Sequence, residues 1–187
     1  MKHIVYKAYW NFEKEERWLN DMAAKGLALT DYTWCRYAFE ETPRGQYLYR
    51  IELLENLPSH PESQAYLRFL EENGVEVVTS YMRWVYLRRD AADGPFDIYT
   101  DLNSQIQHYK RVSTFLNAMT AIEWSVGACN LAVGIANLVV DGQLGNFSNG
   151  NFVLGVCLVA LGFMFFFLGM PIRRKIRALK KQQAITE

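Results

Sequence analysis

Charged residues are almost missing from one long stretch of this chain, and this constrains the fold more than any other feature. Residues 112–172 contain two acids, Glu123 and Asp141, and no lysine or arginine. Two apolar runs lie within this stretch, at residues 115–140 and 152–172. As helices they would be about 39 and 32 Å long, enough to cross a hydrocarbon layer of about 30 Å. Because a helix that is apolar on every side needs a large core or a bilayer around it, we expect a transmembrane hairpin.

The basic residues predict the orientation of this hairpin. Lys110 and Arg111 precede the first run, the short loop at residues 141–151 has no lysine or arginine, and six cations lie in the tail, residues 173–187. Because cytoplasmic segments retain lysine and arginine, we expect both termini in the cytoplasm and the loop outside. We expect Pro171 and Arg173 to end the second span. The tail then predicts a basic helix along anionic lipid headgroups, with its first cations in contact with lipid: Arg173, Arg174, Lys175 and Arg177.

Polar residues in the first run are candidates for function within the membrane. Glu123 is its single carboxylate, and Asn130 and Asn137 follow it. Acids inside a membrane are costly and often mark proton paths, ion paths or helix pairing. The alternative is an interfacial position for Glu123, with Trp124 near the headgroups. Close packing of the two helices is predicted by small residues: Gly127, Ala128 and Gly134.

Residues 1–111 predict a cytosolic α+β domain made of two similar halves. Aligned on Gly26 and Gly74, both halves read as a helix, a glycine, a strand, a turn and an aromatic-rich strand. Helical spacing of apolar residues predicts helices at Glu13–Lys25 and Pro61–Asn73. Strand patterns occur at Ile4–Tyr9, Leu29–Trp34, Arg36–Glu41, Gln46–Leu53, Val75–Tyr81 and Met82–Arg88. Two successive β-α-β-β units favour an antiparallel sheet with both helices on one face, as in a ferredoxin-like sandwich. Asp101 is a plausible cap for a helix that runs from Leu102 into the first span.

The sequence contains no constellation typical of catalysis or metal binding. Three glutamates, Glu13, Glu15 and Glu16, fall in the first turn of the first helix, where carboxylates complement the helix dipole. Three aspartates near a turn fit turn and capping roles better than an ion site: Asp93, Asp97 and Asp101. We therefore expect a non-enzymatic protein without a cofactor or metal.

Aromatic residues on the predicted strands offer a second kind of candidate site. Trp34, Tyr49 and Trp84 could form an exposed sheet face that binds an apolar ligand or a peptide, although most such rings belong to a core. The net charge of about −3 over residues 1–111 argues against direct nucleic-acid binding.

Three segments carry a resemblance to a known family: FEKEERWLNDMAAKG, QYLYRIELL and DGPFDIYTDLNSQIQHYKR. Over about residues 4–111 the chain resembles the N-terminal domain of the DUF2812 family of Gram-positive bacteria. The resemblance implies a protein of the bacterial cell membrane with a cytosolic domain ahead of its transmembrane helices. It also implies a PadR-like transcriptional regulator as a possible partner, since such genes often lie nearby. The family has no established catalytic residues to carry over.

These observations favour a membrane-anchored regulatory or sensory module, with the lipid bilayer and a protein or small ligand as its partners. The alternative is an accessory subunit of a transporter or other membrane complex. In that case the asparagines of the first span would contact larger helices: Asn117, Asn130 and Asn137. An enzyme that uses Asp97 or Asp101 is a third interpretation.

Overall fold

The computed structural model describes residues 2–99, 101–140 and 150–186. The chain divides into two compact units, Met1–Asp101 and Leu102–Glu187. The predicted loop lies outside the described residues except for Gly150 and Asn151, which belong to the second long helix.

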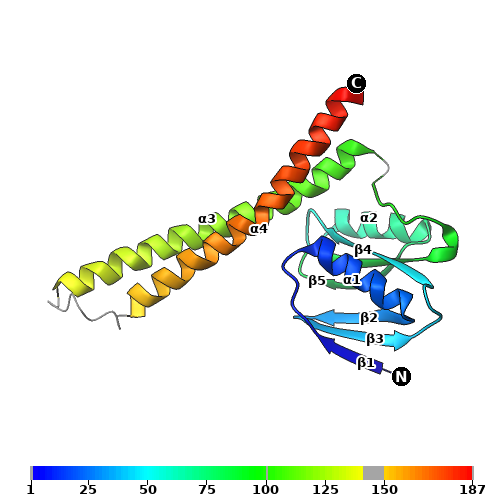
Figure 1. The fold of residues 1–187 in the computed structure, drawn as a ribbon, viewed down its shortest axis with the longest axis horizontal. Helices are drawn as coiled ribbons and strands as arrows, with labels where there is room; N and C mark the ends of the chain where they lie inside the picture. The colour runs from blue at the N-terminus through cyan, green and yellow to red at the C-terminus, as the bar shows by residue number, and fades with distance from the viewer. Residues whose placement is uncertain (1, 100, 141–149, 187) are drawn as a thin grey trace. The chain divides into compact units, whose positions relative to one another are not determined.

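The first unit has the element order that the sequence predicts. Its strands pair antiparallel in two three-stranded sheets, β1-β3-β2 and β4-β6-β5 (Figure 1). The α+β class and the repeated β-α-β-β unit are therefore confirmed, but the strands form two hydrogen-bonded sheets instead of one. In each half, the third strand lies between the first two. The elements are β1 (Lys2–Tyr6), α1 (Phe12–Ala24), β2 (Leu27–Thr33), β3 (Arg36–Glu41), β4 (Tyr47–Leu53), α2 (Pro61–Glu72), β5 (Glu76–Tyr81), β6 (Trp84–Asp90) and the short 3₁₀ helix η1 (Ala91–Asp93).

The two sheets are joined by side chains instead of a backbone ladder. The register of β2 shifts between Leu29 and Asp31, and such an irregularity disrupts the regular pattern of backbone bonds along a strand. Side chains of the second sheet bond the backbone of Leu29: its N–H donates to the Tyr49 hydroxyl at 2.8 Å, and its carbonyl accepts from Arg88 at 3.4 Å. In β5 the register shifts three residues after Gly74, just as it does three residues after Gly26 in β2.

Two apolar clusters form the core of the first unit. The first cluster joins α1 to strands of both sheets through Leu19, Leu29, Tyr37, Tyr49 and Tyr86. The second joins α2 to β5 and β6 and includes Phe96, from the segment after η1. Because α1 contacts both β2 and β4, this helix bridges the two halves of the fold.

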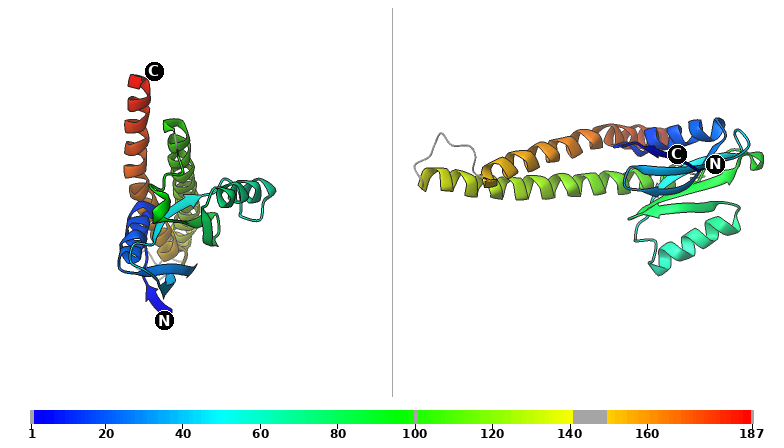
Figure 2. Two further views of the ribbon diagram at one scale, coloured as in Figure 1. Left: turned by 90° about the vertical axis from the view of Figure 1, so that its right-hand side faces the viewer. Right: turned by 90° about the horizontal axis from the view of Figure 1, so that it is seen from below.

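The second unit is a hairpin of α3 (Leu102–Val140) and α4 (Gly150–Thr186), which lie side by side in every view (Figure 2). Both helices are long and apolar enough to cross a membrane. With 39 and 37 residues they measure about 58 and 55 Å, so each exceeds a hydrocarbon layer of about 30 Å. Each span would therefore continue beyond the bilayer as part of a two-helix stalk, residues 102–114 and 173–186.

One predicted helix end is wrong, because α4 continues through Pro171 and Arg173 without a break. Proline lacks the N–H that would bond the Phe167 carbonyl, which usually kinks or ends a helix. Here α4 contacts α3 beyond Pro171: Arg173 donates to the Asn117 Oδ1 at 2.8 Å, and the Lys175 Nζ lies 4.6 Å from the centre of the Tyr109 ring. These contacts hold the turn that follows the proline against its neighbour.

Small residues lie where the two helices are closest. A methyl group added at Gly155 would lie 2.7 Å from Leu131, and one added at Gly162 would collide with the Trp124 ring. The predicted close approach at Gly127 and Gly134 is confirmed. Ala128 is exposed, so the prediction for that residue is wrong.

Candidate functional site

The three predicted sheet-face aromatics occupy three different environments. Tyr49 is fully buried in the first apolar cluster, so its predicted place on an exposed face is wrong. Trp84 is half-buried, and its ring centre lies 5.7 Å from that of Phe12. Trp34 is exposed, but it lies in the turn between β2 and β3 and not on a sheet face. The predicted binding face therefore does not exist as a single surface.

A buried glutamate is a feature that sequence reasoning missed. Glu15 is buried, and one of its oxygens accepts hydrogen bonds from the Tyr37 hydroxyl at 2.7 Å and the Tyr86 hydroxyl at 2.6 Å. Burial raises the pKa of Glu15 above its ordinary 4.5, and the two hydroxyl donors lower it in part. Burial and the Glu15 charge also raise the pKa of both tyrosines, so both stay protonated as donors. Because Tyr37 lies on β3 and Tyr86 on β6, this cluster fastens α1 to both sheets.

The outer edge of β4 is covered by polar side chains of α1. The Tyr49 N–H donates to Asn20 Oδ1 at 2.9 Å, and Asn20 Nδ2 donates to the Tyr49 carbonyl at 3.1 Å. The Ile51 N–H donates to a Glu16 oxygen at 3.0 Å, while Arg50 donates to the other oxygen, also at 3.0 Å. These bonds occupy backbone groups that an edge strand would otherwise expose.

The outer edge of β1 has no comparable cover among the described residues. The Lys7 N–H donates to the Cys35 carbonyl, which sets the ladder so that His3 and Val5 bond β3. By the alternation of an antiparallel ladder, the backbone groups of Ile4 and Tyr6 then point away from the sheet. Their side chains are also exposed, whereas Val5 faces the core. Strand β1 lies at the outer edge of its sheet, beside the N-terminus (Figure 1). The outer edge of β1 is thus open, whereas the outer edge of β4, the corresponding strand of the second half, is covered by α1.

Two hairpin turns display large apolar residues in a strained backbone conformation. Trp34 and Cys35 have φ of 39° and 63° in the β2–β3 turn, and Met82 has φ of 55° in the β5–β6 turn. For residues other than glycine, asparagine and aspartate this left-handed region costs about 1–2 kcal/mol. The two-residue loops between Thr33 and Arg36 and between Tyr81 and Trp84 require positive φ, and they leave Trp34 and Met82 74% and 70% exposed.

The predicted polar residues of the first span do not come together as one site. Glu123 is half-buried and has no hydrogen bond or ion pair among the described residues. Asn130 donates to the Val126 carbonyl of its own helix at 2.9 Å. Asn137 is half-buried near the end of α3.

Of the four predicted lipid-contacting cations, Arg173 has a specific place between the helices. Besides Asn117, it bonds the Phe166 carbonyl at 2.8 Å, and its guanidinium lies 4.8 Å from the centre of the Phe166 ring. The other three are exposed along the outer part of α4: Arg174, Lys175 and Arg177.

The aspartates after β6 take up surface ion pairs. Asp97 is 3.4 Å from Arg50, and Asp93 is 3.8 Å from Arg89. Within residues 2–99, 101–140 and 150–186, no group of three histidines, cysteines or acids could hold a metal ion.

Comparison with protein families shows which family the chain matches. The model of a protein family described as "Protein of unknown function (DUF2812)" matches residues 11–121. The match covers more than half of the chain and extends from α1 into α3. Comparison with curated proteins and with solved structures found no match.

Proposed function

This chain belongs to the DUF2812 family of proteins of unknown function, and we propose that it is a membrane-anchored regulatory module whose cytosolic domain binds another protein. The observation that carries the proposal is the open outer edge of β1. An exposed edge offers unpaired N–H and C=O groups to an extended segment of a partner, which adds as a further strand. Folded proteins usually block such edges, as α1 blocks β4 here.

The chemistry of the β1 edge defines the partner segment. That segment must be extended, so that its backbone can pair with Ile4 and Tyr6. It should carry apolar side chains opposite these two residues, because both are exposed on one face of β1. Lys2 begins the strand, which favours an acidic residue at the matching end of the partner.

We propose that the second unit anchors the module in a membrane. Both α3 and α4 could cross a membrane, and the described cations of this unit all fall at one end of the hairpin. By the positive-inside rule this places both termini in the cytoplasm, and family membership supports a bacterial cell membrane. The module would then present β1 to partners on the cytoplasmic side. Among the described residues, Asn130 bonds its own helix and Asn117 bonds Arg173, so these two asparagines do not specifically favour the transporter-subunit alternative.

The test is purification of the tagged full chain from its native host in detergent, with mass spectrometry of co-purifying proteins. The variant Ile4→Pro removes one outward N–H donor while leaving the bonds of His3 and Val5 to β3, and proline is tolerated on edge strands. The control Ile4→Thr removes the apolar side chain but keeps the donor.

We expect a specific partner with the wild type, a strong loss with Ile4→Pro and a smaller loss with Ile4→Thr. Equal capture by Ile4→Pro would show that the partner does not bind by strand addition. A transporter subunit captured through the helices alone would establish the alternative function instead.

A further inference from the structure

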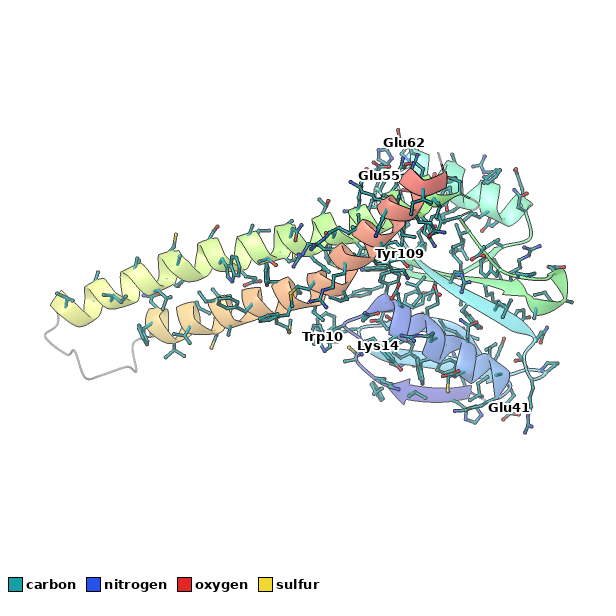
Figure 3. All side chains as sticks on the ribbon, turned by 45° about the horizontal axis from the view of Figure 1, so that its top comes forward. Trp10, Lys14, Glu41, Glu55, Glu62 and Tyr109 are labelled. Atoms are coloured by element: carbon teal, nitrogen blue, oxygen red, sulfur yellow. The ribbon has the colours of Figure 1, made fainter. Side chains whose placement is uncertain are left out.

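Three segments of the first unit meet at one end, where the two hairpin turns lie. The Lys7 N–H donates to the Cys35 carbonyl at 2.8 Å, which joins the end of β1 to the first turn. The Trp34 ring centre lies 6.3 Å from that of Tyr81, the last residue of β5, which joins the first turn to the second. Trp10 and Lys14 lie at the start of α1, and Glu41 lies at the other end of the unit (Figure 3). We define the hairpin end by its exposed apolar residues: Tyr6, Trp10, Trp34 and Met82.

The composition of the hairpin end is unusual for a protein surface. Its three segments, residues 6–10, 33–36 and 81–84, contain six aromatic residues and a methionine. They also contain three cations and no carboxylate: Lys7, Arg36 and Arg83. Two of the exposed apolar side chains are held out by a left-handed backbone, at corresponding turns of the two halves. Two-residue hairpin loops require positive φ whatever residues they carry, so what marks these turns is the exposure of Trp34 and Met82.

We propose that the hairpin end inserts into the headgroup region of the bilayer in which the chain is anchored. Tryptophan and tyrosine favour this region because their rings are apolar and their N–H and O–H groups are polar. Each cation there adds attraction to anionic lipid. Lys7 lies over the Tyr9 and Trp18 rings, and Arg83 bonds the Leu54 carbonyl; neither has an ion pair with a carboxylate among the described residues. Arg36 is partly balanced by Asp31 at 3.5 Å.

The hairpin end is covalently connected to the membrane spans, which favours the bilayer over another protein as its binding partner. Only residues 91–114 separate β6 from the apolar part of α3, so the bilayer surface stays within reach of the hairpin end. A tethered surface has a high effective concentration, and weak insertion is then enough for binding. The inference rests on the membrane anchoring proposed above; the hairpin end shares Tyr6 with the β1 edge, whereas Trp10, Trp34 and Met82 lie outside β1.

Lipids brominated near the headgroup provide the test, because bromine quenches tryptophan fluorescence at contact distance. The full chain is reconstituted in vesicles of phosphatidylcholine and phosphatidylglycerol, with and without brominated chains. The variant Trp124→Phe removes the tryptophan of the spans. Four tryptophans then remain, of which Trp10 and Trp34 are exposed and Trp18 and Trp84 are half-buried.

We expect brominated lipid to quench the emission of Trp124→Phe and expect most of this quenching to disappear when Trp10→Phe and Trp34→Phe are added. Met82→Glu should reduce it, whereas Phe69→Glu, at an exposed apolar position on α2, should not. Quenching should also fall when phosphatidylglycerol is omitted. If Trp124→Phe does not enter vesicles, the same comparison is made with Trp124 retained, as the difference on removing Trp10 and Trp34.

Two different results would separate a hairpin end that does not insert from a chain that is not anchored. Anchored protein whose exposed tryptophans are not quenched would overturn insertion of the hairpin end and leave a protein partner or a second copy as its occupant. Wild-type protein that does not float with vesicles would overturn the anchoring itself.

Discussion

The Glu15 cluster predicts that loss of one hydroxyl group will destabilise the first unit in a pH-dependent way. In Tyr37→Phe the ring keeps its contacts with Trp18 and Tyr32, whose centres lie 4.8 and 4.7 Å away. What is lost is one donor to a buried carboxylate. A hydrogen bond to a charged group contributes about 1.5–3 kcal/mol, so we expect a loss of about 2 kcal/mol in the free energy of unfolding at pH 8.

The pH dependence follows from the direction of the Glu15 shift. Because burial raises the pKa of Glu15 above 4.5, the folded state holds this proton more tightly than the unfolded state. The contribution of Glu15 to stability is therefore fully present below pH 4.5 and is lost as the pH rises through the folded pKa. Removing the Tyr37 donor raises that pKa further. Near pH 4.5 the lost bond is closer to a neutral one, which contributes about 0.5–1.5 kcal/mol.

Urea denaturation of residues 1–101, followed by tryptophan fluorescence at pH 4.5 and pH 8, measures both quantities. In a Glu15→Gln background the amide oxygen still accepts the bond but cannot ionise. There Tyr37→Phe should cost about 1 kcal/mol at either pH. An equal loss at the two pH values in the wild-type background would refute the assignment of Glu15 as the charged acceptor. No loss at all would refute the hydrogen bond.

Three further predictions concern packing and turns. Asn20→Ala leaves the Tyr49 N–H unpaired and its carbonyl with only the 3.5 Å bond from Arg50, and should lower the free energy of unfolding by about 1–3 kcal/mol, whereas Asn20→Asp, which keeps the acceptor, should lose less. Gly26→Ala should destabilise more than Gly74→Ala in the same assay: both have positive φ, but only at Gly26 would the new methyl group lie 2.8 Å from a backbone carbonyl. Gly162→Val should prevent α3 and α4 from closing at Trp124, seen as a red shift and greater quenching of its emission, while Gly150→Val, which has open space, should not.

Local sequence patterns predicted the helices and strands of the first unit well, because each of these elements depends mainly on residues close together in sequence. The strand at Arg36–Glu41 has the predicted bounds. Helix α1 is displaced by one residue at each end, and α2 begins as predicted and ends one residue early. The division into two sheets could not be predicted in this way. It depends on bonds from Tyr49 and Arg88 to Leu29, which are 20 and 59 residues away in sequence.

The candidate sites were harder to predict because their residues break the usual patterns. Trp34 was predicted as the last residue of a strand, but it lies in the following turn, which has no glycine or asparagine to mark its positive φ. A usable signal did exist for Glu15: together with Leu19 and Ala23 it recurs every fourth residue, so it shares the core face of α1. The open edge of β1 depends on what lies beside the strand, which its own five residues do not encode.

The unbroken length of α3 gives the hairpin the mechanics of a lever. Residues 102–114 extend the apolar run by 13 residues, or about 20 Å, without a turn or loop between them. Helices adjust their tilt when the bilayer thickness changes. A change of about 10° would move the end of such an arm by roughly 3 Å. Pro171 lies at the start of the matching arm in α4, where the missing hydrogen bond makes the helix easiest to bend. With the hairpin anchored as proposed, a change in bilayer thickness would displace Leu102, the residue at which the folded domain is attached.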